Sequence, residues 1–265
     1  MADTRQPPSS DIHEFRSALR ASRNVVAIVG AGLSAASDPS IVWKHPHTMR
    51  AMALHAIPNS AHFALSLLCI CIPTFWSTIA PFANFTLVTQ NIDGLSTRAL
   101  EISAEQYNVK WLGTTTSDSE ISKIYEMHGR VLDTLCTSCG HREHNTSSPL
   151  CHALASTTPD QQVPIEELPR GGLLRAGVVW FEEIPHHSRE IWDAVDKADL
   201  SLLIGMSSTI QPAAGYAYYE VKDHGGKVAV LNKERTDGDS ERGFLFLGPC
   251  EETLPSVLFD IESKE

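Results

Sequence analysis

The stretch VVAIVGAGLS, residues 25–34, joins a run of apolar β-forming residues to a turn rich in glycine. Apolar runs of this length that end at a glycine are typical of parallel strands buried inside an α/β sheet. Small residues at Gly30, Ala31 and Gly32 allow a phosphate group to approach the backbone, and a helix that begins there adds a favourable dipole. Ala35 stands where a third glycine would complete the dinucleotide-binding pattern. A tight strand-to-helix turn without a ligand therefore stays open as the alternative.

Three further apolar runs repeat the pattern, namely FTLVTQ from Phe85, LSLLIG from Leu200 and KVAVLN from Lys227. Stretches with helical spacing of apolar residues separate them, among them DIHEFRSALRAS from Asp11 and SREIWDAVDKA from Ser188. Strands that alternate with helices predict an α/β fold with a Rossmann-like, doubly wound parallel sheet.

Residues 130–175 interrupt this alternation, because they are rich in Cys, Ser, Thr, Pro and His and show little periodicity. We expect a small, irregular, zinc-ribbon-like insertion lobe there. The Rossmann-like domain would then be discontinuous and consist of residues 11–129 and 176–260.

The composition excludes some classes of partner. The formal net charge of −11 argues against direct binding of nucleic acid or of anionic membranes, while it allows a basic substrate such as a lysine-rich protein. The longest apolar run, FALSLLCICI from Phe63, is too short to span a bilayer. We also expect a monomer.

The N-terminal residues bear on location. Residues 1–20 contain no apolar segment of the kind found in secretory signals. Asp3, Asp11 and Glu14 argue weakly against a transit peptide, which favours the cytoplasm or nucleus and leaves the mitochondrion open as the alternative. Without a secretory route, the six cysteines are expected to be thiols or metal ligands rather than disulfides.

Polar residues follow the second predicted strand in the segment TQNIDGL. Gln90, Asn91 and Asp93 would project beyond the carboxyl end of that strand, where open α/β sheets bind ligands. Amide and carboxyl groups behind a buried strand need polar partners, which makes a bare polar loop the weaker alternative. His128 follows in the segment EMHGR.

Taken in order, these segments resemble the sirtuins, a family of NAD-dependent protein lysine deacylases. The details SPLC, LPRGGLLR and GPCEETLP are most similar to the desuccinylase/demalonylase-type branch. The resemblance covers most of the chain and rests on Gly30-Ala31-Gly32-Leu33-Ser34, Gln90-Asn91-Ile92-Asp93, His128-Gly129, Cys136 and Cys139, Val178-Val179-Trp180-Phe181, Gly205-Met206-Ser207-Ser208 and Asn232-Lys233-Glu234.

The resemblance implies that the acyl group of a lysine side chain passes to the ADP-ribose part of NAD while nicotinamide leaves. His128 would be the general base for a ribose hydroxyl, which requires an imidazole that titrates near the working pH. Asn91 and Asp93 would complete the catalytic set by positioning the nicotinamide and a water molecule.

The same resemblance implies the binding residues. Val178, Trp180 and Phe181 would form the edge and tunnel for acylated lysine protein substrates, whose extended peptide adds as a strand. Cys250 would contact the adenine through its backbone, although a buried thiol explains it equally well. The implied NAD-binding set is Gly30, Ala31, Gly32, Ser34, Gln90, Asn91, Ile92, Asp93, Gly205, Ser207, Asn232, Glu234 and Cys250.

The chain departs from the family directly after the glycine-rich turn. Sirtuins continue into a segment whose Phe and Arg line the nicotinamide pocket, and a helical lid follows. Here Ser37 is followed by Asp38-Pro39-Ser40, and Trp43 belongs to a motif that the family places beyond the lid. We therefore expect a shortened cofactor-binding loop without that Phe and Arg.

The acyl-selecting residues also differ. Pro46 and Met49 stand where the desuccinylase branch carries a Tyr and an Arg, and that Arg is a donor fork for an acidic acyl group. Arg50 comes one position later and is interpreted either as a substitute or as a surface charge on a helix.

The zinc ligands are incomplete. Cys136 and Cys139 have the spacing of one ligand pair, while a closed structural site needs four ligands. The expected second pair is missing just before GLLR. We expect free thiols at both positions, with a rebuilt zinc site as the alternative that would draw on Cys151, His141, His144 and His152.

Three hypotheses about function follow from these departures. The first is an active NAD-dependent protein deacylase of deacetylase or desuccinylase type. The second is a catalytically impaired NAD- or ADP-ribose-binding protein, because loss of the pocket Phe and Arg costs on the order of 10²–10³ in rate for each key group. The third is an incomplete splice form of an active enzyme.

Overall fold

The computed structural model describes residues 7–37, 46–70, 79–81, 83–109, 123–147, 150, 172–206, 215, 221, 225–236, 239 and 243–259. Six strands form one parallel sheet in the order β3-β2-β1-β7-β8-β9. The first strands of the chain are added on one side of β1 and the later strands on its other side, as in dinucleotide-binding sheets. This strand order confirms the predicted fold class. The strands are β1 (Asn24–Val29), β2 (Asn84–Thr89), β3 (Lys123–Glu126), β7 (Leu200–Ile204), β8 (Lys227–Asn232) and β9 (Phe244–Leu247).

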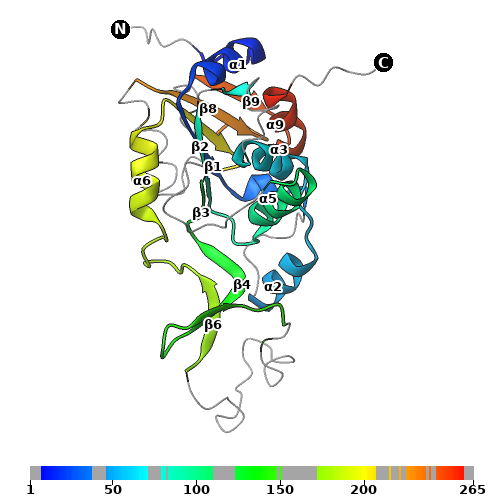
Figure 1. The fold of residues 1–265 in the computed structure, drawn as a ribbon, viewed down its shortest axis with the longest axis vertical. Helices are drawn as coiled ribbons and strands as arrows, with labels where there is room; N and C mark the ends of the chain where they lie inside the picture. The colour runs from blue at the N-terminus through cyan, green and yellow to red at the C-terminus, as the bar shows by residue number, and fades with distance from the viewer. Residues whose placement is uncertain are drawn as a thin grey trace.

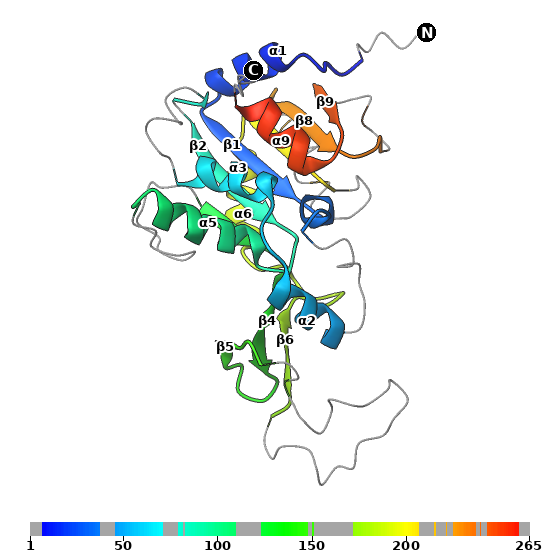
Figure 2. The same cartoon turned by 90° about the vertical axis from the view of Figure 1, so that its right-hand side faces the viewer.

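Helices cover both faces of this sheet (Figures 1 and 2). α6 (Ser188–Asp196) packs on one face through Ile191 and Val195. The opposite face carries α1 (Ile12–Ala21), α3 (Ser60–Cys69), α5 (Leu95–Gln106) and α9 (Cys250–Leu258).

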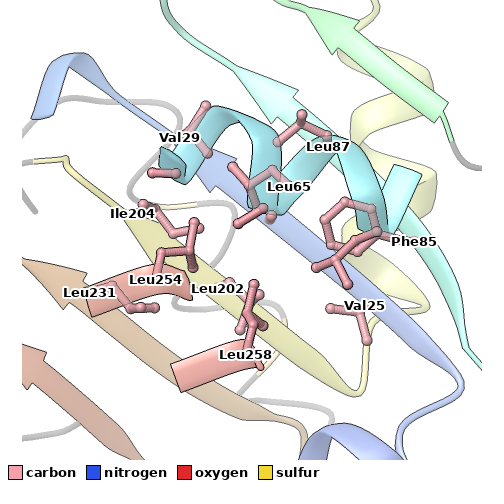
Figure 3. Close-up of a cluster of buried hydrophobic side chains, with 14 of the residues drawn as sticks. Val25, Val29, Leu65, Phe85, Leu87, Leu202, Ile204, Leu231, Leu254 and Leu258 are labelled. Atoms are coloured by element: carbon pink, nitrogen blue, oxygen red, sulfur yellow. The ribbon is translucent and has the colours of Figure 1, made fainter. Parts of the chain in front are cut away.

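The larger hydrophobic core lies between the strands and the helices of that opposite face. Figure 3 shows Val25, Phe85 and Leu202 of the strands meeting side chains of α3 and α9. Each of these strand residues is at most 1% exposed. This burial explains why the sequence shows continuous apolar runs rather than alternation.

A second, smaller sheet extends away from the parallel sheet (Figure 2). It is antiparallel, with the order β5-β4-β6, and it is the predicted small lobe. Its strands are β4 (Gly129–Cys136), β5 (Arg142–His144) and β6 (Leu174–Val178), and α2 (Pro46–His55) packs against β4. The residue boundaries of the two domains stay a prediction.

A third apolar cluster joins the two sheets. It brings Met49 and Ala53 of α2 against Val131 and Leu132 of β4, and Ile92 from the loop after β2 completes it. The loop that carries the predicted catalytic residues is therefore part of the packing between the sheets. Among the helices of the described residues, none is both long and apolar enough to cross a membrane.

Candidate active site

The glycine-rich turn after β1 packs against the end of β7. The backbone N–H of Gly32 donates to the carbonyl of Gly205 at 2.7 Å. A Cβ atom on Gly32 would lie 2.6 Å from the Cα of Gly205, and Gly205 itself has a φ of +59°. The contact between the two loops thus requires glycine at both positions. The small residues at this turn are therefore explained by packing against Gly205, in addition to the predicted approach of a phosphate.

The segment after the turn is shorter than the expected helix. Ala31–Ser34 forms a single 3₁₀ turn that begins after Gly30. The residues on which the shortened-loop prediction depends, 38–45, lie outside the described residues, as does Ser207.

Polar side chains from neighbouring strands meet at the carboxyl edge of the sheet. The Nε2 of Gln90, after β2, lies 3.8 Å from the Sδ of Met206, after β7. Asn232, at the end of β8, donates from Nδ2 to the Met206 carbonyl at 3.1 Å. The structure therefore brings Gly205, Gln90 and Asn232 together, whereas Glu234 is exposed to solvent.

Cys250 begins α9 beside the same edge. Its side chain is 3% exposed, and its Sγ lies 4.0 Å from the carbonyl of Leu231. Burial, followed by the charge of Glu251, raises the pKa of the Cys250 thiol to about 11. The thiol is therefore neutral at ordinary pH, and only the backbone of this residue remains as a contact for a polar ligand.

Ser34 is the centre of a buried hydrogen-bond network. Its Oγ donates to Oδ2 of Asp93 at 2.7 Å. The same oxygen accepts from Nδ2 of Asn91 at 3.0 Å, and Asn91 also donates to the carbonyl of Gly30 at 3.0 Å. The glycine-rich turn and the loop after β2, which are far apart in sequence, are thus fixed to each other.

His62 completes this network, and the sequence analysis did not identify it. Its Nε2 lies 3.3 Å from Ser34 Oγ, while the backbone N–H of Asn59 donates to its Nδ1 at 3.2 Å. The Nδ1 atom also lies 3.0 Å from the side-chain oxygen of Asn59, so it meets a donor and an acceptor of the same residue. The available sequence signal was the capping box at the start of α3, where Asn59 is the N-cap and His62 is the third helical residue.

Burial sets the charge of both ends of this network. It lowers the pKa of His62 to about 4, so the ring is neutral at pH 7. Burial also raises the pKa of Asp93, against hydrogen bonds from the Leu95 N–H and the Ser34 hydroxyl. Burial thus disfavours the charged form of both His62 and Asp93.

His128 lies in the turn between β3 and β4, beside the same loop. Its Nδ1 lies 2.9 Å from the backbone carbonyl of Gln90, which can only accept. The proton of the neutral ring is therefore on Nδ1, and Nε2 is the nitrogen that can take a proton. Burial lowers the pKa of His128, and the bond to Gln90 opposes this shift. A neutral imidazole at pH 7 is what a general base requires.

The predicted substrate-binding residues adjoin His128. The N–H of Val179 donates to the His128 carbonyl at 2.9 Å. Val178 is buried, whereas Trp180 is 56% exposed and Phe181 is 90% exposed. These two aromatic side chains form an apolar surface next to the turn that carries His128.

An ion pair shapes the turn after Phe181. The Glu183 carboxylate accepts the Trp180 N–H at 3.0 Å and contacts Arg175 at 2.8 Å. Glu182 has a φ of +74°, a conformation that favours glycine.

Comparison with known proteins agrees with this geometry. The model of the Sir2 family matches residues 10–212. The chain belongs to the Sir2 family. It is 31% identical over 293 residues to NAD-dependent protein deacylase sirtuin-5B of Xenopus laevis, with 95% of this chain and 86% of the relative covered. It is also 31% identical to an NAD-dependent protein deacylase of Daphnia pulex, with 95% of this chain and 97% of the relative covered.

Solved structures of the Sir2 family share the fold. A Sir2 homolog–NAD complex superposes with a TM-score of 0.68 at 23% identity and covers 97% of both chains. A Sir2 protein bound to an acetylated peptide gives a TM-score of 0.66 at 23% identity, with 94% of this chain and 97% of that chain covered. The Xenopus relative is named as a mitochondrial protein, which does not support the expected cytoplasmic or nuclear location.

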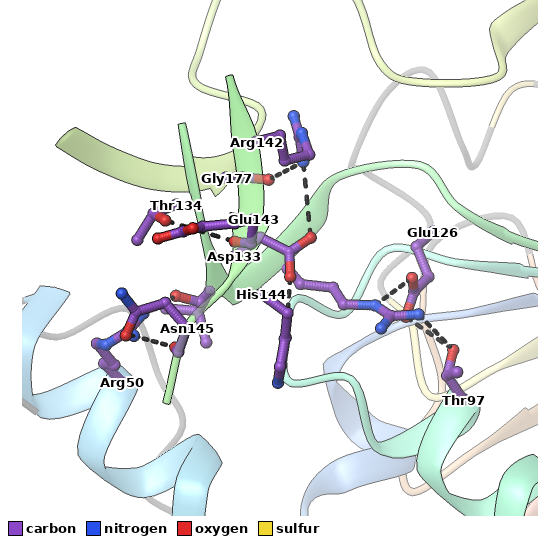
Figure 4. A network of polar contacts seen from close by, with 12 residues as sticks. Arg50, Thr97, Glu126, Asp133, Thr134, Arg142, Glu143, His144, Asn145 and Gly177 are labelled. Atoms are coloured by element: carbon purple, nitrogen blue, oxygen red, sulfur yellow. Dashed lines mark hydrogen bonds and ion pairs between the residues drawn. The ribbon is translucent and has the colours of Figure 1, made fainter. Parts of the chain in front are cut away.

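Arg50 of this Sir2-family chain is not a surface charge. It is 3% exposed, and its guanidinium donates to the carbonyls of Val131 at 2.9 Å and Ser147 at 2.8 Å. A further bond reaches Asn145 (Figure 4). The guanidinium is thus bonded to backbone carbonyls of the small lobe, so the interpretation as a surface charge was wrong, and a role in acyl binding stays a prediction.

The small lobe carries the two cysteines of the predicted ligand pair. Cys136 is partly buried, Cys139 is exposed, and both are free thiols. Within the described ranges, no three His, Cys, Asp or Glu side chains are close enough to hold a metal ion. His144 lies 3.1 Å from Asp133, to which its Nδ1 is paired. Cys151 and His152 lie outside the described residues, so the choice between free thiols and a rebuilt zinc site stays a prediction.

Proposed function

We propose that this chain is an NAD-dependent protein lysine deacylase that transfers the acyl group to ADP-ribose and releases nicotinamide. The observation that carries the proposal is the position of His128. Its proton-accepting nitrogen is set by the Gln90 carbonyl, at the loop that also carries Asn91 and Asp93. The names of the Xenopus and Daphnia relatives support the same activity.

The residues at the carboxyl edge fit a dinucleotide. The glycine-rich turn, Gln90 and Asn232 lie at the carboxyl ends of β1, β2 and β8, where Rossmann-like sheets bind such ligands. NAD, when bound there, supplies the ADP-ribose that accepts the acyl group. We assign the predicted NAD-binding residues to this edge, with Cys250 contributing its backbone.

The side chains of the chain then have distinct tasks. Asn91 and Asp93 are held in place through Ser34, and they orient the nicotinamide end of the ligand. His128 takes a proton on Nε2. Its Nδ1–H remains bonded to the Gln90 carbonyl, which stabilises the charged ring.

The acylated lysine would enter beside His128. Val178, Trp180 and Phe181 bind the extended peptide, because they lie on the strand and turn that hydrogen-bond to His128. We propose acylated protein lysines as the substrate class. We propose that the buried Arg50 does not contribute a carboxylate-binding site, so acetyl and succinyl peptides both belong in the assay.

The test measures nicotinamide release from NAD in the presence of acetyl-, succinyl- and malonyl-lysine peptides, together with the deacylated peptide. We expect peptide-dependent turnover, and a fall of about 10²-fold or more in deacylated peptide for His128→Gln. His55→Gln is the matched control, because His55 is an exposed histidine on α2. Binding of ADP-ribose without any turnover would contradict the proposal and support an impaired, NAD-binding protein.

A further inference from the structure

A ring of polar contacts flanks His128 on both sides in sequence. Glu126 ends β3 and Arg130 lies near the start of β4. The Arg130 Nε lies 2.5 Å from Glu126 Oε2, and the two side chains are 26% and 12% exposed. Thr97 Oγ1 donates to Glu126 Oε1 at 2.9 Å and accepts from an Arg130 terminal nitrogen at 3.2 Å. Figure 4 shows the part of this ring formed by Glu126 and Thr97.

This ring connects the His128 turn to the loop that carries the rest of the site. Thr97 lies in the first turn of α5, which begins directly after Gly94. A Cβ atom on Gly94 would lie 3.9 Å from the Cδ of Arg130, so the arginine stem runs alongside the loop. The Gln90 carbonyl that accepts from His128 belongs to the same loop. A shift of the turn relative to α5 would therefore change the distance between His128 and Gln90.

The burial of the ring makes it sensitive to the loss of one member. Burial raises the pKa of Glu126, and the charge of Arg130 opposes that shift, with Asp133 as the other charged group that acts on Glu126. Removing one partner of such a pair leaves a buried charge without compensation. The charge of His128 also acts on His186, where it contributes to a lowered pKa.

We propose that Thr97, Glu126 and Arg130 form a positioning network that holds the His128 imidazole against the Gln90 carbonyl. The network keeps the ring proton on Nδ1, so that Nε2 takes the proton in the reaction. This role rests on the proposed function of His128 as the base. The network also determines the tautomer of the His128 ring, which can be measured without turnover. The three residues act through His128 and do not touch the substrate.

Thr97→Val and Thr97→Ser are the matched pair of variants. Valine has the shape of threonine without the hydroxyl, whereas serine keeps the hydroxyl. For Thr97→Val we expect kcat for deacylated peptide to fall on the order of tenfold, with KM for NAD unchanged within about twofold. For Thr97→Ser we expect values within about twofold of the wild type, because both bonds of the hydroxyl remain.

The second readout is the tautomer of His128, measured by NMR on protein labelled with ¹⁵N in the histidine rings. His128→Gln assigns the signal. We expect one Nδ1–H tautomer in the wild type and in Thr97→Ser, and a mixture of tautomers in Thr97→Val. If the wild type lacks turnover while this difference is present, the proposed function fails and the positioning network stands.

Two outcomes would overturn the network. One is a lowered Tm for Thr97→Val with unchanged kcat and an unchanged His128 tautomer, which is the result of a purely structural role. The other outcome is measured with Arg130→Lys, a variant that tests the network even if Thr97→Val does not fold. Lysine keeps the charge but lacks the fork that reaches both Glu126 and Thr97. Wild-type kcat and tautomer in Arg130→Lys would contradict the proposal.

Discussion

The Ser34 hydroxyl contacts three polar side chains, because it donates to Asp93, accepts from Asn91 and lies 3.3 Å from Nε2 of His62. The sequence analysis placed Ser34, Asn91 and Asp93 in one site by resemblance, but it did not identify His62. A histidine at the third position of a helix already has a local explanation, because it can complete the capping box. Its second bond, to a residue on another element, exists only in the folded chain.

The buried, neutral His62 makes stability depend on pH. Its folded pKa of about 4 lies below the ordinary 6.5, so below pH 6.5 the unfolded chain binds more protons than the folded one. Stability is therefore lost as the pH falls from 6.5 towards 4. We expect the wild type to lose about 1.5 kcal/mol more stability than His62→Gln between about pH 6.5 and pH 5.

Urea denaturation of both proteins at the two pH values checks this. Glutamine is the appropriate replacement because it does not titrate and can accept the Asn59 N–H in a capping box. Asp93 acts with the opposite sign, because its folded pKa is raised, but it is present in both proteins and its effect is removed in the difference. Equal losses in wild type and variant would show that His62 is not the buried neutral group described.

At the scale of elements, the four long apolar runs predicted four strands of the parallel sheet, and all four are present. The two edge strands, Lys123–Glu126 and Phe244–Leu247, were not predicted, because each has only four residues and no flanking pattern. The role of α2 could not be predicted from the sequence either. Arg50 contacts carbonyls 81 to 97 residues away along the chain, and no local pattern indicates such partners.

Arg50→Met tests the role of α2 as the connection to the small lobe. The substitution leaves backbone carbonyls of β4 and the loop after β5 without a donor, so we expect the free energy of unfolding to fall by about 3 kcal/mol. Arg189→Met, on the exposed face of α6, is the control and should change stability by less than about 0.5 kcal/mol.

A second variant of this residue, Arg50→Lys, distinguishes a structural role from acyl selection. Because the guanidinium is bonded to the lobe, we expect the ratio of kcat/KM for succinyl and acetyl peptides to be the same in Arg50→Lys and in wild type. A selective loss of succinyl activity in Arg50→Lys would show that the residue binds the acyl group after all.

At the scale of the whole molecule, the candidate site lies where the two sheets meet. His128 is in the turn between β3 and β4, and Ile92, within the loop of Asn91 and Asp93, packs in the cluster that joins the sheets. The position of this junction could not be predicted from the sequence, because it depends on the contact of α2 with β4. The sequence did identify the residues that meet there, because their types and order are those of one family.

The central claim is that this chain both holds NAD and breaks it with an acyl-lysine substrate. The most direct measurement is mass spectrometry of a reaction that contains the full chain, NAD and an acetyl- or succinyl-lysine peptide. We predict equal amounts of nicotinamide, deacylated peptide and acyl-ADP-ribose. In His128→Gln we predict loss of the deacylated peptide and of acyl-ADP-ribose, with only residual release of nicotinamide. Intact NAD and an unchanged peptide, in the presence of folded protein that binds NAD, would contradict the account.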